Sequence, residues 1–354
     1  MASSRKERPN TVAEPASIER ALIAPITQCL DQLPQAGDAL AVALSGGPDS
    51  AALAICAQRV ARQRKVPLHL FHVHHGLQKQ ADDWQTTVKA LAELLDCSVH
   101  IRRVQVDLAS GKGLEAAART ARHAALREMA SEADVRCILM AHHQQDQAET
   151  VLMRLLRGAG VGGLAAMAWA RQEGELFWVR PWLDLSKDCI VRFVTQFSDQ
   201  TGWTPVQDPS NQDESLARGI LRQRIMPVIA DHWPNWAQTL SRHARQAAQA
   251  DELLSRYGEL LLRQVSIIDE PGANAPPKIS LPLWRGLAQP EQVLVLRIWL
   301  SDAGALMPTQ SRLAELIRQL RQVHAMGHDR DLTWQQKDCT VRCIGGQLQV
   351  HVKI

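Results

Sequence analysis

The residues best suited to chemistry lie in the hexapeptide SGGPDS at positions 45–50. Its two glycines allow the backbone to come close to an anion, and the exposed N–H groups of a helix's first turn favour phosphate there. Pro48 suits a first-turn position because its missing N–H would have no helical partner, and Asp49 could hold a magnesium ion that bridges phosphate oxygens. Ser45 and Ser50 add hydroxyl donors. The hexapeptide is therefore predicted to bind a pyrophosphate group.

The hexapeptide is not a Walker A motif, because no Gly-Lys-Ser/Thr follows at the required spacing and no lysine is present to reach the terminal phosphates. A loop without that lysine suits enzymes that split ATP between its α and β phosphates and use AMP to activate an oxygen. A serine-glycine turn that only connects a strand to a helix is the alternative. ATP is the predicted ligand, and the predicted ATP-binding residues are Ser45, Gly46, Gly47, Pro48, Asp49 and Ser50.

A second candidate group follows a later apolar run, in the sequence HHQQDQAET at positions 142–150. Asp146 and Glu149 are three residues apart, so they would face the same way from the first turn of a helix. With Asp49 they form a candidate set of magnesium ligands. Zinc is a rival ion, but the adjacent histidines lack helical i, i+4 spacing, and oxygen ligands near a phosphate loop favour magnesium. A helix cap with solvated acids is the simpler alternative.

A third group lies on a predicted helix at 114–131. Glu115, Arg119 and Arg122 are separated by four and three residues, so all three share one face of the helix. The functional interpretation places Arg119 or Arg122 against a substrate phosphate or a developing negative charge, with Glu115 orienting the guanidinium. An ordinary helical salt bridge would have the same spacing.

Three further segments indicate a function less specifically than these groups do. His74 and the histidine after it follow a predicted strand, so they could contact adenosine or form an inert turn. The segment 157–164 has the letters of a dinucleotide-binding fingerprint but follows a helix, so we interpret it as a loop that closes over a substrate. Residues 208–227 combine a polar turn with an arginine-bearing helix, which could clamp a polynucleotide or serve as a plain linker.

An alternation of strands and helices would position these groups. Such alternation indicates a parallel sheet covered on both faces, and ligands bind at the carboxyl ends of its strands, where the hexapeptide lies. Apolar runs predict strands at 39–44, 68–73, 99–106 and 136–141, and helical periodicity predicts helices at 18–33, 50–62, 82–95, 114–131 and 146–157.

The composition changes near residue 215, where helices rich in Ala, Gln, Arg and Leu begin. The helices predicted there span 220–230, 237–264, 290–303 and 309–324, and a hairpin of strands 340–344 and 347–352 turns at Gly345 and Gly346. We therefore expect a disordered tail at 1–18, a catalytic domain at 19–214, and a helical, basic region at 215–354 that ends in the hairpin.

Composition narrows the class of protein. The 354 residues are 45% apolar and lack both a run of about 18 apolar residues and a signal-peptide core, so we expect a cytoplasmic protein without a membrane partner. Seven scattered cysteines indicate neither a disulfide framework nor a zinc site. Residues 215–354 hold 17 Lys and Arg against 12 Asp and Glu, and 14 of the 17 are arginine. That excess is consistent with an RNA partner, although a solvated helical surface would show it too.

Taken together, these stretches resemble the tRNA(Ile)-lysidine synthetase family, within the N-type ATP pyrophosphatases. The resemblance is strong over about residues 36–230, and residues after 280 look like the family's first C-terminal domain. It implies an α/β fold, with a parallel-sheet N-type ATP pyrophosphatase (Rossmann-like) domain followed by a mainly helical C-terminal domain. The matching pieces are 45–50, 72–77, 115–123, 141–150, 157–167, Arg180-Pro181 and 208–227.

The resemblance implies a ligase that uses ATP and Mg²⁺. The 2-carbonyl oxygen of the wobble cytidine of tRNA(Ile) with a CAU anticodon would attack the α phosphate, and free L-lysine would then displace AMP to give lysidine, which changes decoding from AUG to AUA. The implied catalytic residues are Asp49, Asp146 and Arg119; the implied magnesium ligands are Asp49, Asp146 and Glu149; and the implied substrate and tRNA-binding residues are Glu115, Arg122, His142, Arg157, Asn211 and Arg218.

The chain departs from the family pattern at three places. Gln145-Asp146 stands where the family often has two aspartates, so the metal and catalytic role is placed on Asp146. Arg218-Gly219 replaces the usual Arg-Asn pair, which keeps the arginine and loses an amide. Nothing after Ile354 corresponds to the additional C-terminal domain of longer members, so we expect tRNA contacts through that domain to be absent.

Three rival interpretations stay open. Another tRNA-modifying ATP pyrophosphatase, such as a thiolase, would need catalytic or cluster-binding cysteines, and Cys339 and Cys343 lie far from the loop in sequence. An amidating ligase would need an ammonia source, yet Ala2 rather than a nucleophilic cysteine follows Met1. A non-enzymatic RNA-binding protein would have no use for the glycine loop. A homodimer is a candidate for the assembly of this protein.

Overall fold

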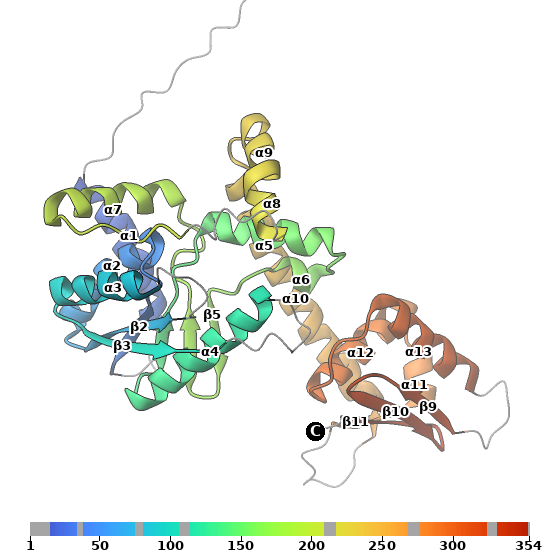
Figure 1. Ribbon diagram of the computed structural model, residues 1–354. Coiled ribbons are helices and arrows are strands. Elements are labelled where there is room, and N and C mark those ends of the chain that lie inside the picture. The colour runs from blue at the N-terminus through green and yellow to red at the C-terminus, as the bar shows by residue number, and fades with distance from the viewer. Residues whose placement is uncertain are drawn as a thin grey trace, which may run out of the picture. The chain divides into compact units, whose positions relative to one another are not determined.

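The structure is a computed structural model, and it describes residues 15–33, 38–74, 81–105, 114–208, 217–267, 276–323 and 331–352. The chain divides into two units, Met1–Gln246 and Ala247–Ile354, each with its own hydrophobic core (Figure 1).

The first unit is built on a six-stranded sheet of order β3-β2-β1-β4-β6-β5. Its strands run parallel to their neighbours except β5, which is antiparallel to β6. From β1 the chain adds β2 and β3 on one side and then continues with β4 on the other side of β1. Open sheets of this kind bind ligands at such a switch point, which here lies between β1 and β4. The strands are β1 (Leu40–Ala43), β2 (Leu68–His74), β3 (Ser98–Arg103), β4 (Cys137–Leu139), β5 (Ala170–Glu173) and β6 (Leu176–Val179).

Helices cover both faces of this sheet because its central strands are apolar on both sides. Leu40 and Val42 of β1 point into the larger core, whereas Ala41 points into the smaller core on the opposite face. The larger core faces α1, α2, α3 and α7, and the smaller one faces α4 (Figure 1). The helices of this unit are α1 (Pro15–Asp31), α2 (Pro48–Arg64), α3 (Ala81–Leu95), α4 (Leu114–Glu132), α5 (Gln144–Leu156), α6 (Val161–Leu164), α7 (Lys187–Thr201), α8 (Ala217–Ile220), the π-helix η3 (Leu221–Ile225), α9 (Met226–His232) and the start of α10 (Trp236–Val265).

The strands and helices predicted between 39 and 157 are confirmed to within a few residues, and so is the parallel-sheet fold. The hairpin of β5 and β6 and the helix α7 were not predicted. β6 is only four residues long, although all four are buried, so its apolar run is too short to be distinguished from a buried turn. Helix α1 begins at Pro15, within the expected tail, and residues 1–14 of that tail lie outside the described residues.

The first unit extends beyond the boundary expected at 214/215. Residues 217–246 remain with it because their side chains contact α5: Arg222 pairs with Glu149, and Ser241 Oγ donates to the carbonyl oxygen of Gln144 at 3.2 Å. The composition therefore changes near residue 215, whereas the division between the units falls at Gln246, inside α10.

The second unit combines helices with a five-stranded antiparallel sheet of order β7-β8-β11-β10-β9. The predicted hairpin is confirmed: β10 and β11 pair up to Ile344 and Gln347, and both turn glycines have positive φ angles, 56° and 76°. The three other strands were not predicted, and two of them have no more than three residues. The elements are β7 (Ser266–Ile267), β8 (Lys278–Ser280), α11 (Leu281–Gly286), α12 (Gln289–Asp302), α13 (Gln310–Gln322), β9 (Leu332–Gln335), β10 (Cys339–Ile344) and β11 (Gln347–Val352).

None of the helices described is long and apolar enough to cross a membrane. All seven cysteines are free thiols, and Cys339 and Cys343 are buried in β10 of the second unit.

Candidate active site

The glycine loop connects the end of β1 to the first turn of α2. Pro48 occupies the first turn of α2, as the sequence predicted, and Gly47 is the N-cap of this helix. The loop turns at Gly46, whose φ of +92° is a conformation that side chains rarely adopt. The Gly46 carbonyl oxygen accepts a hydrogen bond from the Val206 backbone N–H at 2.9 Å, which ties the loop to the segment after α7. The first-turn N–H groups of α2 therefore open toward the carboxyl edge of the sheet, where phosphate would bind.

The two serines of the loop hold its shape. The Ser45 N–H donates to Ser50 Oγ at 3.1 Å, and Ser50 Oγ donates to the Gly47 carbonyl oxygen at 3.1 Å. The two hydroxyl oxygens lie 3.0 Å apart. Ser50 is only 6% exposed. Ser50 therefore preorganises the loop, whereas the sequence had suggested only that it donates to a ligand.

We predict that Gly46→Ala destabilises the protein by about 1–3 kcal/mol, because an alanine there would hold a left-handed conformation. Its Cβ would also lie 3.1 Å from Val206 Cγ2 and 3.3 Å from Val88 Cγ2. Gly47→Ala is the matched control, since φ at Gly47 is −72° and the nearest atom to an added Cβ is 3.6 Å away. Urea unfolding without ligand measures the difference; equal stabilities of the two variants would contradict the strain at Gly46.

Two carboxylates from different elements converge on one imidazole. Asp49 lies in the first turn of α2, and His143 is the N-cap of α5. His143 Nε2 is 3.6 Å from Asp49 Oδ2 and 3.4 Å from Asp146 Oδ2. The other ring nitrogen of His143 accepts from the Gln145 N–H at 3.2 Å, and the His143 N–H donates to Asp146 Oδ2 at 3.1 Å. The cap of α5 therefore fixes Asp146 beside the glycine loop.

Asp146 is held ionised by its surroundings. Burial by itself raises the pKa of the Asp146 carboxyl, but His143, His142, the His143 N–H and Arg222 together hold that pKa below its usual value. Arg222 Nη2 is 3.0 Å from Asp146 Oδ1. The site thus keeps a carboxylate, rather than a carboxylic acid, next to the loop at neutral pH.

The donor atoms near the loop fit a magnesium ion held by two carboxylates. Asp49 Oδ1 is buried and has no hydrogen-bond partner, so one oxygen is available for a cation. Asp146 supplies a second carboxylate next to the same imidazole. The residues that the structure describes contain no group of three His, Cys, Asp or Glu side chains that could hold a metal ion. Magnesium is commonly bound through one or two carboxylates together with phosphate oxygens and water, which matches this pair.

Glu149 differs from the role expected for it. Its side chain is fully buried, with Oε1 2.7 Å from Arg222 Nε and Oε2 3.3 Å from Arg218 Nε. Two guanidiniums thus surround the carboxylate that the sequence grouped with the magnesium ligands. Glu149 holds Arg222 by a hydrogen bond to Oε1, whereas its Oε2 has no hydrogen-bond partner and lies within an ion-pair distance of Arg218. Arg218 Nη2 also reaches Thr150 Oγ1 at 3.4 Å.

Arg222 is the functional residue that sequence reasoning missed. It bridges Asp146 and Glu149 from the π-helix η3, and such π turns occur often at functional sites. A signal was present, because Arg222 follows Arg218 by four residues and two arginines at that spacing share a helix face. What the sequence could not show is that this face meets α5.

The predicted cationic face of α4 reaches the same edge of the sheet. Arg119 is exposed, and Arg122 is half-buried with its Nε fully enclosed. Burial lowers the pKa of Arg122, and the nearby charges of Arg119 and Arg218 lower it further. Burial also lowers the pKa of His142 to about 3, against the opposing effect of Asp146, so this imidazole is neutral at pH 7. The side chain of Glu115, and the whole of Asn211, lie outside the described residues.

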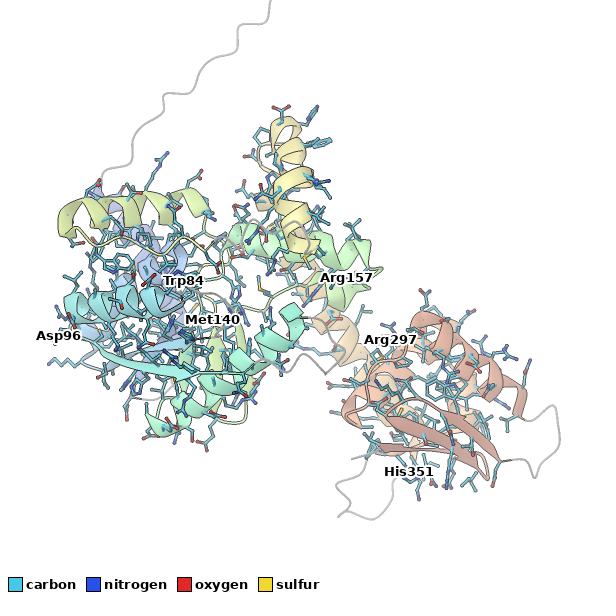
Figure 2. All side chains as sticks on the ribbon, in the orientation of Figure 1. Trp84, Asp96, Met140, Arg157, Arg297 and His351 are labelled. Carbon is cyan, nitrogen blue, oxygen red and sulfur yellow. The ribbon has the colours of Figure 1, made fainter. Side chains whose placement is uncertain are left out.

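The segment after α5 is tied down in the structure. Arg154 Nη1 donates to the carbonyl oxygens of Gly163 and Ala166 at 2.8 and 2.9 Å. The Gln147 amide pairs with both backbone groups of Met167, at 2.9 and 3.0 Å. Arg157 caps the end of α5 and is exposed beside α6 (Figure 2). Of the residues predicted here, Asp49, Asp146, His142 and Arg218 come together, whereas Arg157 is outside the contacts described above.

Comparisons with known proteins identify relatives of both parts of the chain. A family model described as a PP-loop domain matches residues 19–229, and one described as the TilS substrate binding domain matches residues 279–349. The tRNA(Ile)-lysidine synthase of Bordetella parapertussis is 45% identical over 336 residues, which are 95% of each chain. That of Bordetella pertussis is 46% identical over 311 residues, 88% of this chain and 95% of the relative.

A solved structure supports the fold. The U34-tRNA thiolase NcsA from Methanococcus maripaludis, with its [4Fe-4S] cluster, is similar with a TM-score of 0.54 at 14% identity. The match covers 66% of this chain and 79% of that one. At this level of identity the similarity shows the fold alone.

Proposed function

The chain belongs to the tRNA(Ile)-lysidine synthase family, and from this premise we propose that it adenylates the 2-carbonyl oxygen of the wobble cytidine of a tRNA(Ile) with a CAU anticodon and then joins free L-lysine to that carbon. The chain is an enzyme of this type with an ATP-binding PP-loop domain. The observation that supports the proposed chemistry is the convergence of Asp49 and Asp146 on His143, beside the glycine loop.

In the first step, the cytidine oxygen attacks the α phosphate of ATP and pyrophosphate leaves. The loop supports this step by placing the first-turn N–H groups of α2 and the helix dipole against the pyrophosphate. Asp49 and Asp146 would hold Mg²⁺, which when bound would neutralise phosphate charge. Arg119 and Arg218 would contact phosphate or the anticodon loop, where a guanidinium suits either.

In the second step, the neutral ε-amine of lysine attacks the carbon, its extra proton leaves, and AMP departs with the former carbonyl oxygen. His142 is buried and neutral at pH 7, so it can form a hydrogen bond near the cytidine without adding positive charge. Arg222 and Glu149 support the step indirectly, because they hold Asp146 in place. The geometry of Asp146 therefore depends on Arg222, which lies 76 positions later in the chain.

The direct test is incorporation of labelled lysine into a tRNA(Ile) transcript with a CAU anticodon, with ATP and magnesium present. A tRNA(Met) transcript, which shares the anticodon, is the control. We expect incorporation into the tRNA(Ile) transcript only. Pyrophosphate release without incorporation would overturn the lysine step and retain adenylation, whereas no tRNA-dependent AMP release would favour a protein that only binds RNA.

A further inference from the structure

A group of buried nitrogen atoms near the ends of β4 and β6 has no hydrogen-bond partner. Its members are the Nε atoms of Arg122 and Arg180, Nε2 of His123 and Nδ1 of His142. They come from three elements: the face of α4, the turn after β4 and the residue that follows β6. Buried polar atoms in proteins are normally paired, so four unpaired donors or acceptors in one group indicate a missing ligand.

A ring contact and the strand register bring these side chains to one end of the sheet: His123 contacts Trp178, two residues before Arg180, and Leu139, three residues before His142, pairs with Val179. Burial, together with the charges of Arg119, Arg122 and Arg180, lowers the pKa of His123 to about 4. The same three arginines lower the pKa of His142. The ring of His123 also lies 4.6 Å from that of Trp178 on β6, measured between ring centroids. The cluster is thus a group of buried, positively charged side chains in which both imidazoles are neutral at pH 7.

Arg180 is the member whose position is most tightly fixed. It directly follows β6, and its side chain is buried, with 6% of the residue exposed. Its backbone N–H donates to the Trp169 carbonyl oxygen at 2.7 Å, and Nη1 donates to the Ala168 carbonyl oxygen at 3.0 Å. These bonds orient the guanidinium and leave Nε free. Burial and the charges of Arg119 and Arg171 lower the pKa of Arg180 to about 10, so it is still charged at neutral pH.

The carboxylates that the structure describes offset the charges of Arg122 and Arg180 only in part. Neither Arg122 nor Arg180 forms an ion pair with a described residue. Glu173 is the acid that acts on Arg180, and it is already paired with Arg127 and Arg171, the latter at 3.0 Å. Unpaired buried charge is unfavourable, and a guanidinium fork matches the oxygens of a phosphate group. An anionic ligand would remove both the unpaired charge and the unpaired donors.

The cluster is separate from the glycine loop. Strand β4 lies between β1 and β6, and Leu139 of β4 is the register partner of Val179, the residue before Arg180. The loop follows β1 and leads into α2 on one face of the sheet, whereas the cluster uses α4, which packs on the other face. A phosphate in the cluster would therefore be a different one from the pyrophosphate in the loop.

We propose that Arg180 and Arg122 form a second phosphate-binding site, in which Arg180 is a binding residue. The proposed function supplies two sources of such a phosphate: the α phosphate of ATP, or a phosphodiester of the RNA next to the target nucleotide. The identity of these two sources rests on the proposed function. The arrangement of the two arginines does not depend on it. Both present the same tetrahedral oxyanion to the guanidiniums.

The test compares Arg180→Met, Arg180→Lys and Arg171→Met with the wild-type chain. Arg171→Met is the matched control, since it removes a nearby exposed arginine that already pairs with Glu173. The affinity for ATP is measured without RNA, and the affinity for the tRNA(Ile) transcript is measured without ATP at several salt concentrations. We expect Arg180→Met to weaken one of these two affinities by about 10-fold or more. Arg180→Lys should have an intermediate affinity, because lysine keeps the charge but not the guanidinium fork. Arg171→Met should keep both affinities within about twofold of the wild-type values.

The two sources give different results. An RNA phosphodiester predicts weaker tRNA binding, with the slope of log K against log salt reduced by about one and ATP affinity unchanged. The α phosphate of ATP predicts weaker ATP binding and an unchanged salt slope for tRNA. Unchanged affinity for both ligands in a folded Arg180→Met protein would overturn the site.

A second measurement covers the case in which Arg180→Met folds poorly. The rise in melting temperature on adding saturating ATP or tRNA should be smaller in Arg180→Lys than in the wild-type chain, and a purely structural role would leave this rise unchanged. These readouts need no lysine transfer. Normal lysine incorporation with unchanged binding would overturn the site alone, whereas weakened binding in a chain that never incorporates lysine would overturn only the proposed reaction.

Discussion

Asp49→Asn is expected to lower tRNA-dependent pyrophosphate release by at least about 100-fold and to leave tRNA affinity within about twofold. Asp49 is next to the phosphate loop, and its Oδ1 is a buried oxygen without a hydrogen-bond partner. An amide has the same shape but no charge to offer a cation, so the change removes electrostatic stabilisation without enlarging the site. Pyrophosphate release with saturating ATP and tRNA measures the first effect, and a filter-binding titration measures the second.

Asp188→Asn is the matched control for that variant. Asp188 is exposed in the first turn of α7, as Asp49 is in the first turn of α2, so both changes remove the same favourable charge from a helix N-terminus. We expect Asp188→Asn to release pyrophosphate at the wild-type rate. Loss of tRNA binding together with normal adenylation in Asp49→Asn would contradict the role assigned to Asp49.

Glu149→Gln is expected to destabilise the protein by about 3–5 kcal/mol, the range for breaking a buried ion pair. Glu149 is fully buried between Arg218 and Arg222, and its loss leaves Asp146 as the only carboxylate within an ion-pair distance of Arg222 among the described residues. Arg222→Met should cost about 3 kcal/mol, because it leaves Glu149 with the longer contact to Arg218. Urea unfolding without ligand measures both values.

The double variant tests whether these residues act as a unit. Because each single change removes part of the same interaction, the cost of Glu149→Gln with Arg222→Met should fall at least about 1 kcal/mol below the sum of the single costs. Arg102→Met is the control, since it breaks an exposed pair with Glu132 and should cost less than about 1 kcal/mol. Strict additivity would show that Arg222 and Glu149 stabilise the site independently.

The sequence by itself determined the parallel sheet and the position of the glycine loop. Strands buried on both faces are nearly continuous apolar runs, so β1 and β4 could be recognised from single segments, and β2 from apolar residues interrupted by histidines. The carboxyl ends of parallel strands share one edge, and for that reason the order of the segments is enough to place Asp49 after β1 near Asp146 after β4. Such inferences need only local pattern and a general rule of topology.

The tertiary structure alone decided which charges meet. Glu149 was grouped with the magnesium ligands from its spacing to Asp146, but it pairs with arginines more than 65 residues away. Arg222 bridges the two acids because η3 packs on α5, and no local pattern encodes that contact. Arg180 is an ordinary surface residue type, yet its place after the buried strand β6 encloses it without an ion pair to any carboxylate that the structure describes. Burial and pairing are properties of the packed chain, since they depend on which distant elements touch, whereas spacing along the sequence reports only what a single helix or strand can align.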